Sequence, residues 1–379
     1  MKFIINSLLF SKQIQSLSGV LTNNNTVPII NCFHFHLDDG MLTIRATDLE
    51  TTLISKIEVE TGNITGLTDI AVPSKLLLDI VKSLDDVPLT FNVDDSTDAS
   101  SIVSGEGKYR LAGKNPETFP SMPEPRDTTS ITLSSSLLVN AVSKTAFAAS
   151  TDELRQQMSG ILCEINTEHI TFVATDAHKL VRYRRNDVKS DTPVSFILPR
   201  KPVVMMRNIL ASHKEEMDVQ LDYNNTNAFF TFDNFNIICR LVEGRYPNYD
   251  AAIPKENPNK LTIDRNSFLN TLRRVSLFAN QASHQIRLSI QANELVVSAE
   301  DLEFSNDASE KLPCQYEGDP MEIGFNAKFL TEMVSNIDTE QILIEMSHPS
   351  RAGIIFPVTD EQDSPEDILM LVMPVMLAN

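Results

Sequence analysis

The stretch Ile170-Thr171-Phe172-Val173-Ala174-Thr175-Asp176-Ala177-His178 decides the fold of this chain, because the sequence contains it in three versions. The same pattern of an alternating strand followed by an acidic turn occurs at residues 42–50 and 295–303. The aspartates of the three turns, Asp48, Asp176 and Asp301, are 128 and 125 residues apart. Solenoid repeats are far shorter, at ~20–50 residues. The spacing therefore predicts three tandem copies of one small domain.

Three further landmarks recur in the same order. Each copy opens with a strand and a helix that Ser or Asn caps, lysines that precede an apolar run lie 126 and 127 residues apart, and prolines recur every 127 residues. These landmarks are Lys75, Lys201 and Lys328, and Pro120, Pro247 and Pro374. We expect domains over 1–124, 129–252 and 258–379, with Pro-rich polar linkers at 121–129 and 254–259.

The predicted fold class is α+β, with antiparallel sheets and two helices on one side of each domain. Alternating segments such as 41–47, 228–232 and 341–346 are typical of half-buried strands. The six expected helices cover 7–20, 74–84, 135–148, 200–210, 266–280 and 326–336. Three tandem copies offer one face to the next copy, so two chains could close a six-domain ring head to tail.

Composition indicates a cytoplasmic protein without a disulfide framework. The four cysteines, Cys32, Cys163, Cys239 and Cys314, are far apart and form no CxxC pair. The longest apolar run, 368–377, is half of the ~20 residues that a membrane-spanning helix needs. We also see no signal peptide at the N-terminus.

The charge is distributed unevenly. The chain carries a net charge of −19, which by itself argues against nucleic acid. The six helical segments nevertheless contain ten basic residues and only Asp79 and Glu332 as acidic ones, although Glu forms helices as readily as Lys. The basic residues are Lys12, Lys75, Lys82, Lys144, Arg200, Lys201, Arg207, Arg273, Arg274 and Lys328. If the helices share a surface, this very acidic protein has one basic face. The alternative is that these Lys and Arg residues simply lie on solvent-exposed helix faces without a common function.

Neither an enzyme nor a metal protein is indicated. The repeated aspartates lie one per copy at turns, where Asp commonly binds its own backbone, and not as a converging pair. The P-loop, HExxH and GxSxG motifs are absent, and His34 and His36 without a third ligand are weak evidence for zinc. We expect no cofactor. An acidic protein-interaction scaffold that never meets DNA remains the alternative, although it does not explain the basic helices.

The chain resembles a known family over essentially its whole length: the bacterial DNA sliding clamp, the β subunit of the replicative DNA polymerase III. The resemblance lies in Met1-Lys2-Phe3, in residues 174–180, in Pro199-Arg200-Lys201, in residues 243–249 and in Val372-Met373-Pro374. It implies a homodimeric ring around double-stranded DNA that has no catalytic activity. Such a ring tethers polymerase subunits and repair proteins, and a clamp loader opens it. The basic helices fit this function independently, because sliding requires phosphate attraction without base contacts.

The resemblance also implies two protein-binding surfaces. Partner peptides are expected in an apolar pocket between domains two and three, which flexible methionines could adapt to varied side chains. By position, this pocket comprises Arg155, Met158, Thr175, His178, Leu180, Pro247, Asn326, Val372, Met373, Pro374 and Met376. The dimer interface would comprise Tyr109 and Leu111 of domain one and Leu277 and Phe278 of domain three, for which ordinary core packing is the alternative.

The chain departs from the family pattern near the pocket. Ala177 and Lys179 stand where Gly and Arg are typical, and Ala251 and Ala252 replace larger residues. These changes leave the preferred partner peptide open. Asn24 occupies a loop in which the family can carry an arginine, so a DNA contact of that loop is open as well.

Overall fold

The computed structural model describes residues 1–22, 26–62, 67–94, 97, 99–359 and 364–377. The chain forms two compact units, and the division between them falls inside the second copy. The first unit contains residues 1–140 and 201–241, and the second contains residues 141–200 and 242–379. Asn24, whose contact with DNA the sequence left open, lies outside the described residues.

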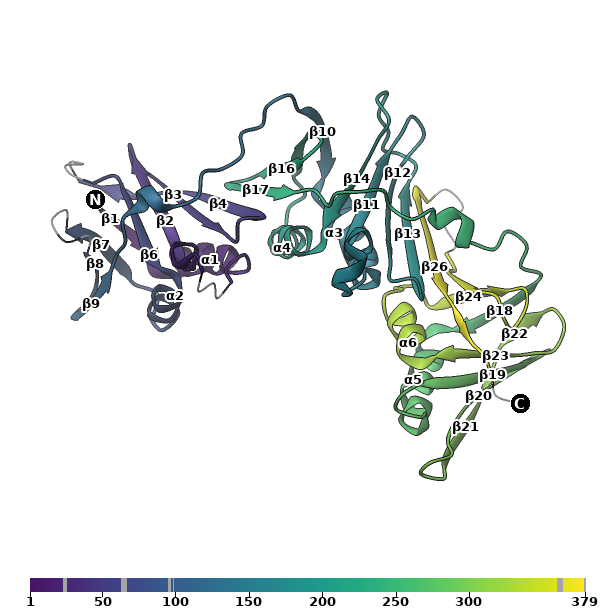
Figure 1. The fold of residues 1–379 in the computed structure, drawn as a ribbon. Helices are drawn as coiled ribbons and strands as arrows, with labels where there is room; N and C mark the ends of the chain where they lie inside the picture. Colours follow the sequence, from purple (N-terminus) through teal and green to yellow (C-terminus); the bar gives the residue numbers. More distant parts are fainter. Residues whose placement is uncertain (23–25, 63–66, 95–96, 98, 360–363, 378–379) are drawn as a thin grey trace. The chain divides into compact units, whose positions relative to one another are not determined.

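The first unit contains two antiparallel sheets, with strand orders β5-β1-β7-β8-β9 and β10-β15-β16-β17-β4-β3-β2-β6 (Figure 1). The strands are β1 Lys2–Asn6, β2 Cys32–Asp38, β3 Met41–Thr47, β4 Thr51–Glu58, β5 Glu60–Thr61, β6 Asp69–Pro73, β7 Pro88–Asp94, β8 Ala99–Ser104, β9 Gly107–Ala112, β10 Thr129–Ser134, β15 Asp218–Tyr223, β16 Asn227–Phe232 and β17 Phe235–Arg240. The helices of the first copy are α1 Ser7–Ser18 and α2 Ser74–Lys82.

The second unit repeats this arrangement, with strand orders β14-β11-β12-β13-β26-β25-β24-β18-β22 and β21-β20-β19-β23-β27. Its strands are β11 Gly160–Ile165, β12 Ile170–Thr175, β13 Lys179–Arg185, β14 Val194–Pro199, β18 Asn259–Asp264, β19 Gln285–Gln291, β20 Glu294–Asp301, β21 Asn306–Pro313, β22 Gln315–Glu317, β23 Met321–Asn326, β24 Gln341–Met346, β25 Gly353–Pro357, β26 Glu366–Val372 and β27 Pro374–Val375. The helices of the third copy are α5 Arg265–Val275 and α6 Ala327–Ser335. The second copy contributes α3 Ser135–Thr145 and α4 Arg200–Ala211, and the division between the units passes through both helices.

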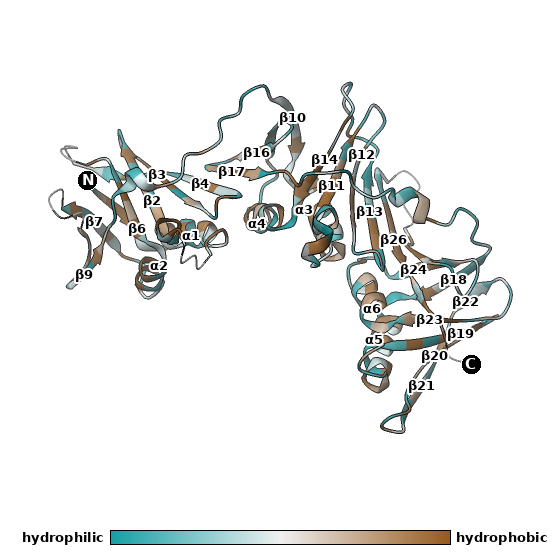
Figure 2. Ribbon diagram, viewed as in Figure 1, coloured by the Kyte–Doolittle hydropathy of each residue, from teal (hydrophilic) through white to brown (hydrophobic). Residues whose placement is uncertain are grey.

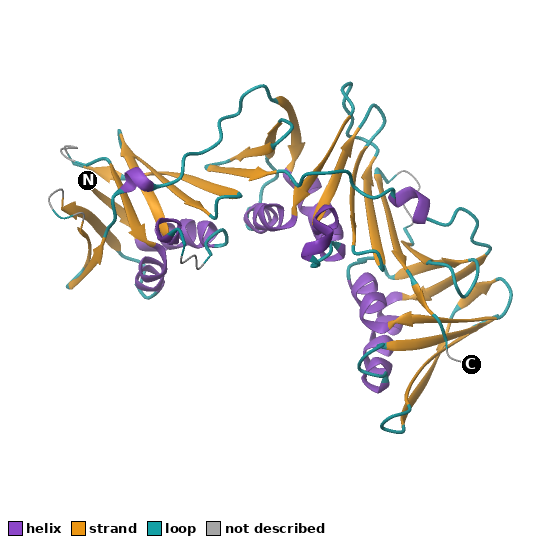
Figure 3. Cartoon of the chain, viewed as in Figure 1, coloured by secondary structure: helices purple, strands orange, loops and turns teal. Residues whose placement is uncertain are grey.

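Helix α1 illustrates how the sequence builds each copy. The Asn6 side chain accepts hydrogen bonds from the backbone N–H groups of Leu8 and Leu9, which satisfies donors that have no partner within the helix. Phe10, Ile14 and Leu17 are then fully buried at a spacing of four and three residues, which places them on one helix face. Within each unit, the helices lie on one side of the strands (Figure 3), and brown apolar segments run along the strands beneath them (Figure 2).

Both long sheets cross from one copy into the next. Strand β4 of the first copy pairs with β17 of the second, with Leu53 opposite Ile237. Strand β13 of the second copy pairs with β26 of the third, with Tyr183 opposite Ile368. In each case, the strand after the acidic turn of one copy meets the last long strand of the following copy. These shared sheets explain why the packing units divide the second copy.

The predicted fold class is confirmed: the chain is α+β, with antiparallel sheets and two helices in each copy. All six helices begin within one residue of their expected first residues. Five of them end earlier than expected, and short 3-10 turns follow two of these five, η3 Ala146–Ala148 after α3 and η6 Ser276–Phe278 after α5. The continuity of the sheets across copies was not predicted. None of the described helices combines the length and apolar character needed to cross a membrane.

Candidate functional site

A tight turn between β12 and β13 carries two of the predicted pocket residues, Thr175 and His178. The Asp176 carboxylate accepts hydrogen bonds from the backbone N–H groups of His178 and Lys179, both at 2.9 Å. The Thr175 hydroxyl donates to the Lys179 carbonyl at 2.7 Å and accepts from the Ala177 N–H at 3.1 Å. Ala177 has a φ of 76°, in the left-handed region that favours glycine. Hydrogen bonds of the Thr175 and Asp176 side chains therefore fix the conformation of the turn, and His178 is exposed on it.

The other two repeated aspartates have the same structural role. Asp48 accepts from the N–H groups of Glu50 and Thr51, at 3.1 and 2.7 Å, and Asp301 accepts from the Glu303 N–H at 3.1 Å. This local bonding is the reason for the repeat that the sequence revealed, and it supports the interpretation of these residues as turn formers.

The predicted pocket has a buried apolar floor in the second unit. Leu180 packs in one cluster with Val173 and Leu371 and with two tyrosines, Tyr246 and Tyr249, of the connector between copies two and three. Burial raises the pKa of both tyrosine hydroxyls well above the usual range, and the Tyr249 hydroxyl donates to Glu164 at 2.7 Å. The hydroxyls thus stay neutral and the tyrosines serve as apolar packing. The predicted residues Thr175 and Val372 are also buried, and Pro247 directly follows Tyr246.

The C-terminal segment lies directly beside the turn. The backbone N–H of Met373 donates to the His178 carbonyl at 2.8 Å, which extends the pairing of β13 with β26. The side chains of Met373 and Met376 are 39% and 75% exposed, whereas Pro374 pairs with Phe325 of β23. Met373 therefore remains accessible beside His178, and Met376 is exposed three residues further along the chain, as a surface that adapts to varied partners would require.

A second side of the site is polar. Arg155 and His178 line a cavity of about 460 Å³ together with Asp152, Phe329 and Glu332. Arg155 lies in a 3-10 segment, η4 Glu153–Ser159, 3.5 Å from the Asp152 carboxylate. The neighbouring predicted residue, Met158, is partly buried.

Asn326, predicted to flank the pocket, caps helix α6. Its side-chain oxygen accepts from the N–H groups of Lys328 and Phe329, at 3.0 and 3.3 Å, and caps helix α6. Its amide NH₂ donates to the Ser283 carbonyl at 3.1 Å. The side chain is thus engaged within the third copy, and it positions the first turn of α6.

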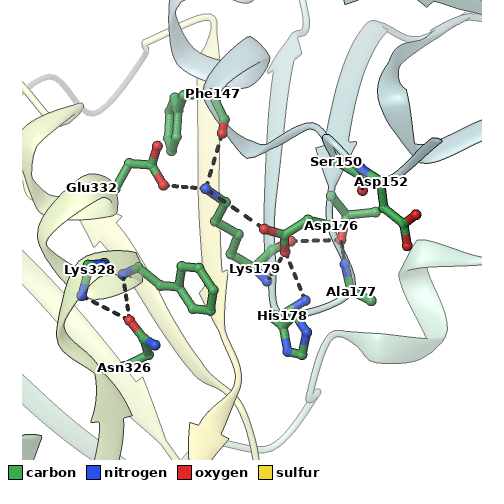
Figure 4. A network of polar contacts seen from close by, with 12 residues as sticks. Phe147, Ser150, Asp152, Asp176, Ala177, His178, Lys179, Asn326, Lys328 and Glu332 are labelled. Atoms are coloured by element: carbon green, nitrogen blue, oxygen red, sulfur yellow. Dashed lines mark hydrogen bonds and ion pairs between the residues drawn. The ribbon is translucent and has the colours of Figure 1, made fainter. Parts of the chain in front are cut away.

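A buried lysine joins the turn to helix α6 (Figure 4). Lys179 is 6% exposed, its ammonium forms an ion pair with Glu332 of α6, and it donates to the Phe147 carbonyl at 3.1 Å. The sequence marked Lys179 as a departure from the family but gave no role to Glu332 or Phe329. The one indication in the sequence that Glu332 is unusual was that it is one of only two acidic residues in the six predicted helices.

The ten basic residues predicted to face DNA fall into two groups. Three of them are ion-paired within the chain: Lys144 with Asp338, Lys201 with Asp48 at 2.6 Å, and Arg274 with Glu310 at 2.6 Å. Among the described residues, no carboxylate partner is found for the other seven, of which Lys12, Lys75, Lys82, Arg200, Arg273 and Lys328 are exposed and Arg207 is half-buried. The basic surface is therefore smaller than the residue count suggested.

The predicted dimer-interface residues differ in exposure. Leu277 and Phe278 of the third copy are 81% and 41% exposed, and Tyr109 is partly exposed on β9. Leu111 is only 1% exposed, so it belongs to the core of the first copy, which was the stated alternative for these residues. Leu302 and Phe304, to which the sequence assigned no role, are 83% and 68% exposed in the turn before β21. The one indication in the sequence was that Leu302 and Phe304 alternate with acidic residues in the segment 300–304.

The two neighbouring histidines of the first copy, His34 and His36, share one carboxylate partner. His36 Nδ1 lies 3.0 Å and His34 Nε2 lies 3.3 Å from the Asp69 carboxylate. No group of three or more potential metal ligands occurs in the part of the chain that the structure describes.

Three repeated domains, sheets that cross from copy to copy, and an apolar site between the second and third copies define the class of DNA sliding clamps. Sequence profiles of the DNA polymerase III β subunit match the N-terminal domain at residues 1–123, the central domain at 132–248 and the C-terminal domain at 250–375. The β sliding clamps of Pseudomonas putida and Vibrio cholerae are 25% and 26% identical to the chain, and each match covers all of both chains.

Solved structures agree with the sequence comparison. The Pseudomonas aeruginosa clamp bound to griselimycin has a TM-score of 0.92 at 25% identity, and the β subunit of Thermotoga maritima has a TM-score of 0.90 at 25% identity. Both matches cover 100% of both chains. The chain belongs to the DNA polymerase III β subunit family. Its function is accordingly that of a sliding clamp, a processivity factor for DNA polymerase, and not that of an acidic scaffold without a role on DNA.

Proposed function

We propose that two copies of this chain close head to tail into a ring around double-stranded DNA. The observation that carries the proposal is the pairing rule between successive copies: β4 pairs with β17, and β13 pairs with β26. By the same rule, β21 of the third copy requires the last long strand of a following first copy, which is β9. Both β21 and β9 lie at the edge of their sheets among the described strands. A second chain can satisfy both edges in a closed arrangement.

The chemistry of the two edges supports this seam. Strand β9 carries the exposed Lys108 and Arg110, whereas the turn and strand at the other end carry Glu303, Asp307 and Glu310. Opposite charges on two edges favour their association over the pairing of like edges. The exposed side chains of Leu277, Phe278, Leu302 and Phe304 would supply the apolar contact of the seam.

The DNA would lie against the basic helices. The seven basic residues without an intramolecular carboxylate partner are distributed over five of the six helices, so that each copy contributes cations. Phosphate attraction is independent of base sequence, and the remaining acidic surface disfavours DNA elsewhere on the protein. A ring held by its topology needs no further base contacts in order to slide.

Partner proteins would insert short peptides beside His178. The buried floor of Leu180, Thr175 and Val372 and the exposed Met373 and Met376 supply an apolar pocket, and Arg155 supplies a polar rim. We assign DNA polymerase subunits, the clamp loader and repair proteins to this pocket. Pro247 and Pro374 would stiffen its walls, and Ala251 and Ala252, both exposed, leave it wider on one side.

The proposal includes no catalytic activity, no cofactor and a cytoplasmic location. The repeated aspartates already bind their own turns, so they are not poised for acid–base chemistry. We retain 1–124, 129–252 and 258–379 as the three clamp domains, each of which shares a sheet with its neighbour.

Two measurements test the proposal. The mass in solution should be twice 42.3 kDa at micromolar concentration, and a monomer would contradict the ring. A fluorescein-labelled peptide copied from the polymerase subunit of the same organism should bind, and Met373→Ala combined with Leu180→Ala should abolish binding while the dimer persists. Unchanged affinity in that double variant would refute the assignment of the pocket. Griselimycin, which is bound to the Pseudomonas aeruginosa clamp, serves as a second probe.

A further inference from the structure

Lys179 is buried between the turn that carries His178 and helix α6. We propose that Lys179, through its ion pair with Glu332, is a positioning residue that holds Phe329 of α6 against His178 and so builds one wall of the peptide pocket. The inference deepens the proposed function and rests on it. It concerns Lys179, Glu332 and Phe329, none of which the sequence placed in the pocket.

The ammonium of Lys179 is held from several directions. It forms an ion pair with Glu332, donates to the Phe147 carbonyl at 3.1 Å, and lies 3.9 Å from Asp176. It also lies 5.7 Å from the centre of the Phe147 ring and 5.5 Å from that of Phe329, within the range of cation–π attraction. A buried charge persists only with such compensation, so removal of one partner leaves a strongly unfavourable group behind.

The same contacts determine the position of helix α6 relative to the turn. Phe329 and Glu332 are three residues apart and therefore project from the same side of the helix. Lys179 contacts both of them, and the neighbouring residue His178 stacks its ring on Phe329, with 5.8 Å between ring centres and 17° between ring planes. His178 and Lys179, which are consecutive in the chain, thus both contact one turn of α6.

The ring of Phe329 lies beside the proposed peptide pocket. The His178 carbonyl accepts the Met373 N–H, so the turn joins the apolar pocket to the stacked rings. Phe329 and His178 also line the polar cavity with Arg155. The stacked pair therefore joins the lining of this cavity to the strand that carries Met373. We expect the pair to contact an apolar side chain of the bound peptide.

The alternative is that the Lys179–Glu332 pair only stabilises the contact between the second and third copies. The chain offers a matched control, because Lys144 forms an ion pair with Asp338 and donates to the Asn336 carbonyl at 2.9 Å. This pair also joins the second copy to the third, but involves no aromatic ring. Glu332→Gln and Asp338→Asn each remove one carboxylate charge without a change in shape.

The experiment uses the full-length dimer and two readouts. Affinity for the labelled polymerase peptide is measured in Lys179→Met, Glu332→Gln and Asp338→Asn. In parallel, Phe329→Trp introduces the only tryptophan of the chain, and its emission is recorded without peptide in the same three backgrounds. We expect Lys179→Met and Glu332→Gln each to weaken peptide binding by about tenfold, because the ring at position 329 is no longer held against His178, and to shift the emission to the red. Asp338→Asn should change neither readout.

The outcomes separate the inference from the proposed function. If the unsubstituted protein fails to bind the peptide, the proposed pocket is wrong, while the emission still reports whether Lys179 positions the ring. If Glu332→Gln and Lys179→Met match Asp338→Asn in affinity, Lys179 does not determine peptide binding and the inference is overturned. A loss of affinity with unchanged emission would equally overturn it, because Lys179 would then not act through Phe329.

Discussion

The turn before β21 exposes Leu302 and Phe304, and truncation of both tests how the ring closes. Their side chains are 83% and 68% exposed in one chain, far more than apolar side chains of that size usually are. If β21 pairs with β9 of a second chain, the variant Leu302→Ala with Phe304→Ala removes apolar contact from the seam. Leu277 and Phe278 and the charges of Lys108 and Arg110 would remain at the seam, so the variant isolates the contribution of the turn.

The expected magnitude follows from burial and symmetry. Complete burial of one such side chain contributes about 1.5–3 kcal/mol, so partial burial of the two together contributes about 2 kcal/mol at one seam. A head-to-tail dimer has two identical seams, and dissociation opens both. The double truncation should therefore cost about 4 kcal/mol, which is roughly a thousandfold in the dissociation constant.

Sedimentation velocity over a range of concentrations measures this effect. The unsubstituted chain should remain a dimer at concentrations where the variant is a monomer, and circular dichroism should show that the variant is folded. Leu154→Ala is a suitable control, because Leu154 is 93% exposed but belongs to η4 of the second copy and to neither edge strand. A variant that stays as dimeric as the Leu154→Ala control would refute the assignment of this seam.

Three further predictions concern charge, pH and backbone strain. Asp48→Asn keeps the side-chain oxygen that accepts the hydrogen bonds of its turn but removes the ion-pair partner of Lys201. The slope of the logarithm of the association constant for a short DNA duplex against the logarithm of the salt concentration should therefore steepen by up to about one unit per chain. An unchanged slope would exclude Lys201 from the DNA surface. Burial, and then the neighbouring Arg45, lower the pKa of His34 from 6.5 to about 4, so the unfolded chain binds a proton first and the melting temperature should fall as the pH drops from 6.5 to 4. His34→Gln should flatten that dependence, and an equal slope in the variant would contradict the assignment. Ala177→Gly should raise the free energy of unfolding in urea by less than about 1 kcal/mol, because glycine relieves the left-handed strain but adds freedom to the unfolded chain; a loss of stability would show that Ala177 is not strained.

The elements of the fold followed from the sequence because the threefold repeat supplied each pattern three times. Helix α6 was expected at 326–336 and lies at Ala327–Ser335, since Asn326 caps it and Leu330, Met333 and Val334 form its buried face. The pairing of β13 with β26 could not be predicted in this way. Strand pairing between copies depends on which edges remain open after each copy has folded, and local hydrophobic alternation carries no information about the partner.

The site was predictable where it depends on backbone position and less so where it depends on side-chain partners. Thr175, His178 and Met373 come together because β13 and β26 are neighbours. The prediction that Asn326 flanks the pocket came from its position, and the sequence did not indicate that its side chain caps α6. The pairing of Lys179 with Glu332 joins residues 153 positions apart, and no spacing rule relates two side chains at that distance along the chain. For the same reason, the ion pair of Lys144 with Asp338 could not be predicted from the sequence.

Retention on circular DNA tests the central claim most directly. The labelled dimer is loaded with a clamp loader onto a nicked circular plasmid and is separated from free protein by gel filtration. A ring that encloses DNA without tight contacts should stay on the circle through moderate salt and should be lost when a restriction enzyme linearises the plasmid. Equal retention on circular and linear DNA would show binding without enclosure, and would contradict the sliding ring.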